Sequence, residues 1–178
     1  ACMAAYLSLN TGERCGEVCA NVVSDAQISR RMMHVGATVV EPKGQKPTRQ
    51  QRTKGRKSRN LSLDECVCER IEAQKSHIPE RIWGDFSRPI CCGARGELLR
   101  PSSVSARFKA IARQLGLPEG TSFHTLRHTH ATMLIANGVD MRTVQERMGH
   151  ANVSTTLSLY AHVVPGRDQA AAAAFSEA

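Results

Sequence analysis

The last third of the chain is divided into segments whose apolar residues recur with helical spacing, and each segment ends at a glycine. The three glycines are Gly116, Gly138 and Gly149. Glycine is the residue that most often follows a helix, because it adopts the left-handed backbone conformation without strain. Ser102 or Ser103 can cap the first segment, and Asp140 can cap the third. The pattern predicts helices over residues 102–115, 124–137 and 140–149.

Two of these helices carry apolar residues that we expect to face a core. They are Val104, Phe108, Ile111 and Leu115 in the first helix, and Leu126, Met133 and Leu134 in the second. A further helix from Asn152 or Ser154 would carry Tyr160 and close at Pro165, and residues 167–178 predict a terminal tail helix. With 178 residues, of which 41% are hydrophobic, the chain can bury one substantial core. We therefore expect a single domain over residues 1–178.

The first part of the chain mixes helices with a small amount of strand. Asn10-Thr11-Gly12 ends one predicted helix, and residues 13–23 and 64–74 predict two more. Residues 36–41 and 57–63 have strand character, and Pro42, Gly44 and Pro47 interrupt the chain between them. The fold class is therefore α+β and mostly helical, with a small antiparallel sheet or hairpin within about residues 36–63.

Positive charge is concentrated in one stretch. Eight of the 24 basic residues, and no acidic residue, lie in residues 43–59, while the other 16 basic residues equal the 16 acidic residues in number. The eight are Lys43, Lys46, Arg49, Arg52, Lys54, Arg56, Lys57 and Arg59. A solvated charge run is one interpretation, and a surface that binds the phosphates of a nucleic acid is the other.

Several classes of protein are disfavoured by composition. No apolar run approaches the roughly 20 residues that cross a bilayer, so we expect no membrane association and a cytoplasmic location. The seven cysteines are odd in number and lack the spacing of common zinc sites, so we interpret them as reduced thiols. His124 and His128 are four residues apart, but no glutamate follows His124 as the metalloprotease pattern requires. We expect neither a metal nor a cofactor.

Residues 123–160 contain the side chains needed to attack a phosphodiester. His124 and Arg127 are three residues apart, His150 follows Gly149, and Tyr160 comes ten positions later. Arginine offers a planar set of donors to phosphate, histidine transfers protons near neutral pH, and a tyrosine hydroxyl can become a covalent nucleophile.

Three blocks of this region resemble the catalytic C-terminal domain of tyrosine recombinases, the phage and transposon integrase family. They are Phe123-His-Thr-Leu-Arg-His-Thr-His-Ala-Thr, Met148-Gly-His-Ala-Asn-Val-Ser-Thr-Thr and Leu159-Tyr-Ala-His-Val. Upstream, Thr11-Gly-Glu-Arg-Cys-Gly-Glu is similar to the block of the first catalytic arginine. Thr53-Lys-Gly-Arg-Lys-Ser-Arg-Asn-Leu-Ser-Leu is similar to the catalytic hairpin.

The resemblance implies a role for each matching residue. The catalytic set would be Arg14, Lys54, His124, Arg127, His150 and Tyr160, with Glu17 supporting Arg14. Lys57 and Lys46 are rival positions for the lysine on the same stretch, and Arg14 could instead be a simple helix ion pair with Glu17. The remaining cations of residues 43–59 would contact DNA phosphates.

The resemblance also implies an activity and partners. The chain would cleave and rejoin double-stranded DNA through a 3′-phosphotyrosyl intermediate, during integration or excision of a prokaryotic, phage or transposon element associated with the nucleoid. It would act as a homotetramer on paired sites through a Holliday junction, and be monomeric without DNA. Core-binding and arm-binding domains would lie upstream of this chain. Relaxation of DNA by a type IB topoisomerase-like enzyme, and a non-catalytic DNA-binding relic, are the alternatives.

Overall fold

The computed structural model describes residues 2–51, 58–76 and 87–149. The chain divides into two compact units, residues 1–130 and 131–178. The helices are α1 (Cys2–Thr11), α2 (Cys15–Ala20), α3 (Glu65–Ser76), α5 (Pro101–Gln114), α6 (Phe123–Ala136) and α7 (Met141–Met148), with short 3₁₀ turns at Val23–Asp25 and Ile28–Arg30. The strands are β1 (Ala26–Gln27), β2 (Met32–Val35), β3 (Ala37–Val40), β4 (Thr48–Gln51) and β5 (Arg59–Ser62). The α+β, mostly helical prediction is confirmed.

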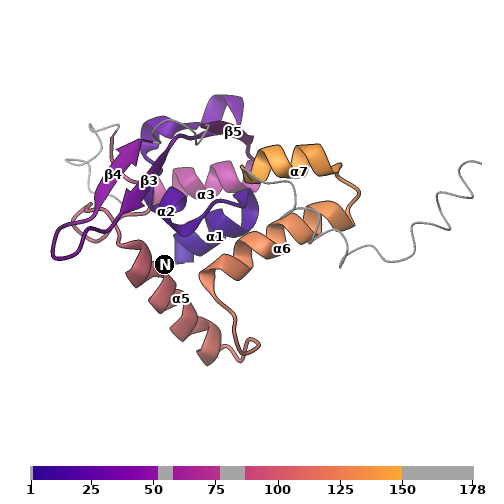
Figure 1. Ribbon diagram of the computed structural model, residues 1–178. Helices are drawn as coiled ribbons and strands as arrows, with labels where there is room; N and C mark the ends of the chain where they lie inside the picture. Colours follow the sequence, from indigo (N-terminus) through magenta and orange to yellow (C-terminus); the bar gives the residue numbers. More distant parts are fainter. Residues whose placement is uncertain (1, 52–57, 77–86, 150–178) are drawn as a thin grey trace, which may run out of the picture. The chain divides into compact units, whose positions relative to one another are not determined.

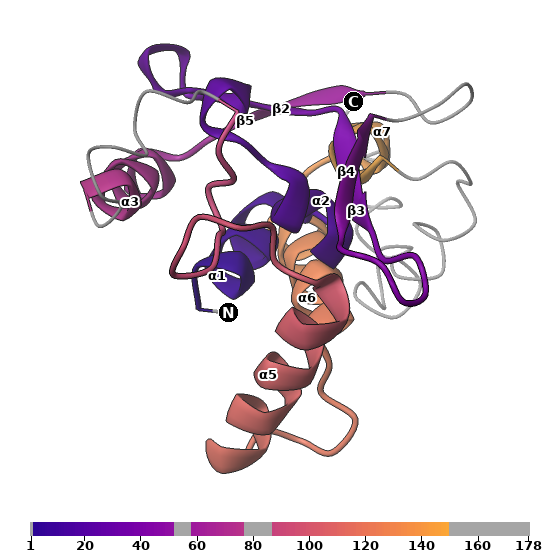
Figure 2. The same cartoon turned by 90° about the vertical axis from the view of Figure 1, so that its left-hand side faces the viewer.

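Two small antiparallel sheets form in the first unit. One has the order β1-β2-β5, and the other is the β3–β4 hairpin, in which Val39 faces Arg49. Figure 2 shows the two sheets meeting where β2 runs into β3 through Gly36. The sequence predicted the strands around β3 and β5 but not β1, β2 and β4. Strand β5 pairs with β2, so the two predicted strands do not pair with each other.

A buried apolar cluster holds this unit together. Its largest fully buried apolar side chains are Leu7, Met33, Leu61, Ile71 and Ile90. They come from α1, β2, β5, α3 and the segment before α5, so the core joins elements that are far apart in sequence. Burial of each such side chain is worth about 1.5–3 kcal/mol relative to an exposed position.

Most of the predicted helix ends match the structure, but α5 begins at Pro101 after Arg100, so Ser102 and Ser103 do not cap it. Gly12 adopts φ 72° directly after α1. Gly116 and Gly138 adopt φ 68° and 80° just after α5 and α6. In the second unit, the Asp140 carboxylate accepts a hydrogen bond of 2.9 Å from the backbone N–H of Thr143, and Gly149 ends α7 with φ 60°. Ile135, Val144 and Met148 form the small core of that unit with Ala131.

Some of the predicted core residues are exposed. Leu115 is 71% exposed at the end of α5, and Met133 is 56% exposed on α6. Figure 1 shows that the C-terminal end of α5 extends away from the other elements of the first unit, and Leu115 directly follows this end. The described residues contain no helix long and apolar enough to cross a membrane.

Helix α2 lies unusually close to β3 at Gly16. A Cβ atom at this position would be 2.6 Å from Thr38 Oγ1 and 3.3 Å from the Val39 carbonyl oxygen. Alanine would fit only if Thr38 Oγ1 and the Val39 carbonyl moved, so the close contact between α2 and β3 favours glycine. The residue that precedes this helix, Arg14, is thereby held close to the sheet.

We expect Gly16→Ala to lower the free energy of unfolding by about 1–3 kcal/mol through this overpacking. Alanine would otherwise favour the helix by up to about 1 kcal/mol, so a loss reports the contact itself. Urea denaturation of Gly16→Ala, Thr38→Ala and the double variant is the measurement. Removing Thr38 Oγ1 should recover part of the loss in the double variant, whereas additive losses would contradict the close contact.

Candidate active site

Arg14 occupies the turn between α1 and α2. It has an extended backbone (φ −72°, ψ 155°) at the N-cap of α2, and its side chain is 42% exposed. Glu17, one turn into the helix, accepts a hydrogen bond of 3.1 Å from the Arg14 backbone N–H and one of 3.0 Å from Arg14 Nη1. The carboxylate therefore fixes both the backbone and the guanidinium of Arg14, a contact expected both of a residue that supports a catalytic arginine and of a simple helix ion pair.

Two side chains of α6 bind the end of α1. Arg127 Nη1 donates a short hydrogen bond to the Gly12 carbonyl, and His130 Nδ1 donates one of 2.9 Å to the Leu9 carbonyl. Both side chains are buried, with 2% and 8% exposed. The last carbonyls of a helix lack partners within the helix, and here α6 supplies them. Because Gly12 lies two residues before Arg14, this contact brings α6 to the turn that carries Arg14.

His124 lies on the same helix, one turn before Arg127. Its ring and the ring of His128 are exposed and meet edge to face, with centroids 4.6 Å apart. Partial burial lowers the pKa of His124, and the charges of His128, Arg127 and Arg14 lower it further. A histidine in this field is neutral at pH 7 and can accept a proton.

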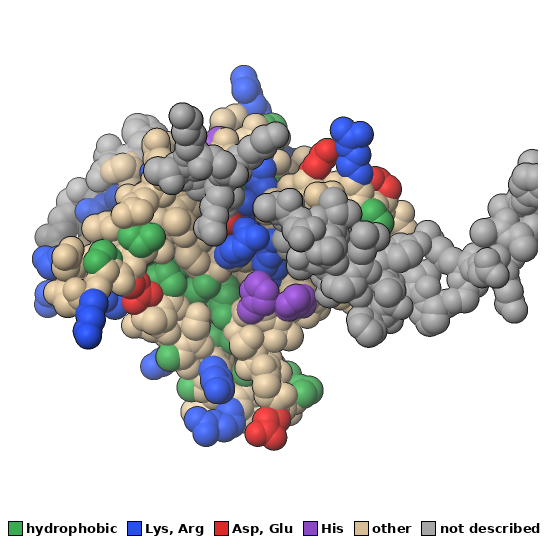
Figure 3. All heavy atoms as spheres, in the orientation of Figure 1, with side chains coloured by type: hydrophobic (Ala, Val, Ile, Leu, Met, Phe, Trp, Pro, Cys, Tyr) green, Lys and Arg blue, Asp and Glu red, His purple; other side chains and the backbone are tan. Residues whose placement is uncertain are grey.

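The structure therefore brings Arg14, Glu17, His124 and Arg127 together within the first unit. Figure 3 shows a pair of histidine side chains next to a group of Lys and Arg side chains on one face of the molecule. The other predicted catalytic residues, Lys54, His150 and Tyr160, lie outside the described residues.

Two arginines of the basic stretch, both predicted to contact phosphates, make internal ion pairs. Arg49 Nε donates to the carbonyl of Ala20, the last residue of α2, over 2.8 Å, and Arg49 Nη2 lies 3.0 Å from Asp25 Oδ2. Arg59 is 9% exposed, and its Nη2 lies 2.8 Å from Glu17 Oε2. Both arginines join elements of the fold, and Arg49 keeps 28% of its side chain exposed.

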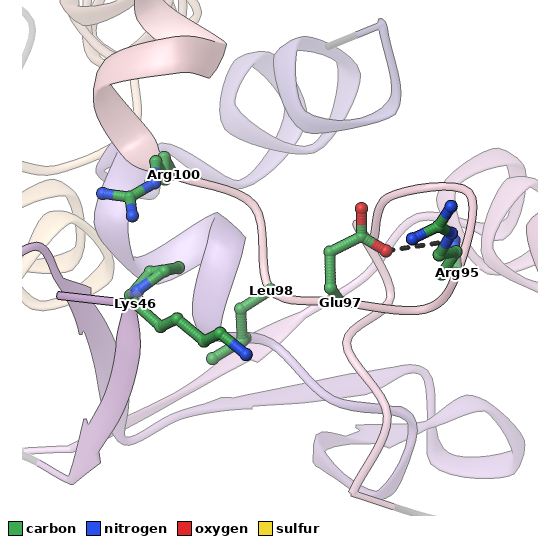
Figure 4. Close-up of a pocket in the computed structure, with 6 residues that line it drawn as sticks. Lys46, Arg95, Glu97, Leu98 and Arg100 are labelled. Carbon is green, nitrogen blue, oxygen red and sulfur yellow. Dashed lines mark hydrogen bonds between the residues drawn. The ribbon is translucent and has the colours of Figure 1, made fainter.

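Two lysines of the same stretch, also predicted to contact phosphates, lie at the surface. Lys43 and Lys46 are exposed in the turn between β3 and β4. Lys46 lines a pocket of about 480 Å³ together with Pro47, Arg95, Glu97, Leu98 and Arg100. Figure 4 shows its side chain extending toward Leu98. Arg52, Arg56 and Lys57 lie outside the described residues.

The pocket contains two cations that the sequence did not indicate as site residues. Arg100 Nη2 donates to the Gln45 carbonyl over 2.8 Å, which holds its guanidinium against the β3–β4 turn. Glu97 accepts from the backbone N–H of Arg95 over 3.0 Å. Three cations and one carboxylate give the lining a positive balance. Arg95 and Arg100 are far from residues 43–59 in sequence, so only the folded chain brings these charges together.

A buried acidic residue next to Arg14 was also missed. Glu13 is 0% exposed, and its Oε1 accepts a hydrogen bond of 2.8 Å from Asn21 Nδ2. Its Oε2 lies 2.9 Å from the Thr11 hydroxyl, which also lies 2.7 Å from the Leu7 carbonyl. A hydroxyl has one hydrogen, so a protonated Glu13 that donates to Thr11 leaves that hydrogen for Leu7. Burial raises the pKa of Glu13, although its bonds to Asn21 and Thr11 and the charge of Arg59 lower it.

Comparison with known proteins gives a consistent set of relatives. The model of the phage integrase family matches residues 2–167. Tyrosine recombinase XerC of Rhizobium meliloti (strain 1021) is 39% identical over 103 residues, which are 58% of this chain and 32% of that protein. Tyrosine recombinase XerD of Bifidobacterium longum (strain NCC 2705) is 37% identical over 124 residues, which are 63% of this chain and 38% of that protein. The matches thus span about a third of the length of these relatives.

Solved structures share the fold. The Tn1549 transposon integrase in complex with a circular intermediate DNA superimposes with a TM-score of 0.83 and 22% identity, over 99% of this chain and 58% of that one. XerA recombinase gives a TM-score of 0.69 with 23% identity, over 93% and 54% of the two chains.

We expect Glu13→Gln to remove a pH dependence of stability. Burial raises the pKa of Glu13 above the unfolded value of about 4.3. The protonated side chain therefore stabilises the fold fully below that pH, and this stabilisation is lost as pH rises through the folded pKa. Glutamine preserves the neutral hydrogen bonds at every pH. Urea denaturation should therefore give the variant the higher free energy of unfolding at pH 8 and a smaller difference at pH 5. A wild-type advantage that grows with pH would show that Glu13 is ionised in the fold.

Proposed function

This chain belongs to the phage integrase family, and from that premise we propose that it cleaves and rejoins DNA strands in site-specific recombination. The observation that carries the proposal is the convergence of Arg14, His124 and Arg127 on the turn after α1. These are three of the positions at which the sequence matches the family's catalytic blocks. The chemistry is transfer of a DNA phosphate to a tyrosine hydroxyl and back to a DNA hydroxyl.

The arginines would stabilise the reacting phosphate. A DNA phosphodiester is already anionic, and attack by an oxygen nucleophile increases the negative charge on its non-bridging oxygens. Guanidinium groups fixed before the reaction stabilise that charge without reorganisation. Arg14 is fixed by Glu17, and Arg127 by the Gly12 carbonyl. Neutral His124 is suited to accept or return a proton at the same phosphate.

Tyr160 would be the nucleophile. Its hydroxyl would give its proton to His124 and its oxygen would bond to the scissile phosphorus, while the bond from phosphorus to the 5′ oxygen breaks. Lys54 would donate a proton to that leaving oxygen, and His150 would donate a hydrogen bond to the phosphate. The product is a 3′-phosphotyrosyl link and a free 5′ hydroxyl. A 5′ hydroxyl from a partner duplex reverses the steps, so strands are exchanged without ATP.

The relatives favour exchange between sites over relaxation or binding alone. XerC and XerD are named tyrosine recombinases, and the Tn1549 protein is a transposon integrase bound to circular intermediate DNA. We propose double-stranded DNA as the partner of this chain, with four copies acting on two paired sites, in the cytoplasm of a prokaryotic cell. The arginines supply the charge neutralisation that magnesium gives in other phosphoryl transfers, so no cofactor is proposed.

We expect Tyr160→Phe to abolish the covalent DNA adduct and leave DNA affinity nearly unchanged, because one hydroxyl supplies the bond and little of the binding. The measurement is a nicked suicide substrate, whose cleaved 5′ fragment diffuses away and traps the adduct on a denaturing gel. His128 lies one turn after His124 on α6 and offers a matched control. The His128→Asn variant should still form the adduct. Adduct that survives in Tyr160→Phe would mean that another residue is the nucleophile.

We expect Lys46→Gln and Arg49→Gln to separate DNA contact from stability. If Lys46 contacts a phosphate, its loss should reduce the slope of log affinity against log salt by about 0.9. Arg49→Gln should keep that slope and instead lower the free energy of unfolding by about 1–3 kcal/mol, since Asp25 and the Ala20 carbonyl lose a donor. Binding from 50 to 300 mM salt and urea denaturation test both variants. Identical behaviour of the two would contradict this division.

A further inference from the structure

The Glu17 carboxylate is held by two guanidinium groups from different elements. Arg14 donates from its backbone N–H and Nη1 over 3.1 and 3.0 Å. Arg59 approaches the same two oxygens, with Nη2 at 2.8 Å from Oε2 and Nη1 at 3.5 Å from Oε1. The Glu17 side chain is only 2% exposed, and that of Arg59 9%. Water therefore screens this carboxylate little, and its charge acts on the groups around it.

The second arginine changes the charge that Arg14 can offer to a phosphate. Glu17 and Arg14 alone form a pair with no net charge, and the carboxylate would compete with the phosphate for the guanidinium. With Arg59 bound to the same carboxylate, the three groups carry a net charge of +1. Arg14 is the most exposed of the three, with 42% of its side chain accessible. It is therefore the one through which that charge reaches a ligand.

The position of Arg59 is fixed by the sheet. It is the first residue of β5 and pairs with Val35 of β2. Burial lowers the pKa of its guanidinium while the charge of nearby Glu13 raises it, but an arginine remains charged at any physiological pH. The Arg59 side chain therefore connects β5 to the N-terminus of α2. The basic segment that precedes β5 in the sequence includes Lys54.

We infer that Arg59 is a positioning residue for the proposed reaction: it binds Glu17, so that Glu17 orients Arg14 without neutralising it. This inference rests on the proposed function, because it assigns Arg14 to the scissile phosphate. It also separates Arg59 from Lys43 and Lys46, which are exposed and would contact the DNA backbone directly. Arg59 itself touches no reacting atom.

The test compares Arg59→Met, Glu17→Gln and the double variant in single-turnover cleavage of the suicide substrate. In Arg59→Met, Glu17 loses the guanidinium that balances its charge, so cleavage should slow by at least about 10-fold, less than the roughly 10²–10³-fold loss of a group that touches the transition state. In the double variant the competing charge is gone, and cleavage should be faster than in Arg59→Met. The salt slope of DNA binding should stay at the wild-type value in all three.

Two results would overturn the inference. A salt slope reduced by about 0.9 in Arg59→Met would make Arg59 a phosphate contact. A double variant no faster than Arg59→Met would make Arg59 a structural ion pair only. Should Arg59→Met fail to fold, as its thermal midpoint would reveal, Arg59→Gln with and without Glu17→Gln gives the same comparison, because glutamine keeps a hydrogen-bond donor but removes the charge.

The same assay distinguishes failure of the inference from failure of the proposed function. Tyr160→Phe and Arg14→Ala are run beside the variants. If the native protein forms no adduct that depends on Tyr160, the proposed function is wrong and the role of Arg59 falls with it. If the adduct depends on Tyr160 and Arg14 but the double variant shows no recovery, only the inference about Arg59 is wrong.

Discussion

The hydrogen bonds from α6 to the end of α1 are the contacts on which the site depends. Arg127 and His130 bind carbonyls of Gly12 and Leu9, more than a hundred residues earlier in the chain. Buried donors without acceptors are costly, so both side chains and both carbonyls favour this one arrangement. The same contact brings Arg127 and His124 to the turn that holds Arg14. A residue assigned to catalysis thus also holds the fold at the site, and changing Arg127 would alter both.

Two buried carboxylates, Glu13 and Glu17, lie near Arg14 and are bound by different kinds of group. Glu17 faces two guanidiniums, so its charge is matched within the fold. Glu13 has the Thr11 hydroxyl and the Asn21 amide as its hydrogen-bond partners, and burial raises its pKa. An ionised Glu13 would add a second negative charge behind Arg14. Burial therefore favours the neutral form of Glu13, which adds no negative charge at the turn, while Glu17 orients Arg14.

Local signals in the sequence predicted most of the helices, and long-range contacts account for the errors. Gly12, Asp140 and Gly149 mark helix ends because capping depends on a few neighbouring residues. Leu115 was expected in the core because helical spacing identifies an apolar face but not whether another element covers it. Strands β2 and β4 were missed because each is short and is stabilised by a partner strand. For the site, motif spacing indicated Arg14, His124 and Arg127, whereas Glu13 and Arg100 needed the folded chain.

The basic stretch shows why a charge count is a poor guide to binding. Its four described cations divide by residue type: Lys43 and Lys46 are exposed in a turn, and Arg49 and Arg59 pair with carboxylates. A lysine ammonium is strongly hydrated and remains in solvent, whereas a planar guanidinium can satisfy two acceptors at once and is buried at lower cost. Arg49 and Arg59 connect strands β4 and β5 to α2, so their charge stabilises the packing of α2, the helix that Arg14 precedes. In the described part of this stretch Lys43 and Lys46 are the more exposed cations, and the position of each cation in the fold determines what it binds.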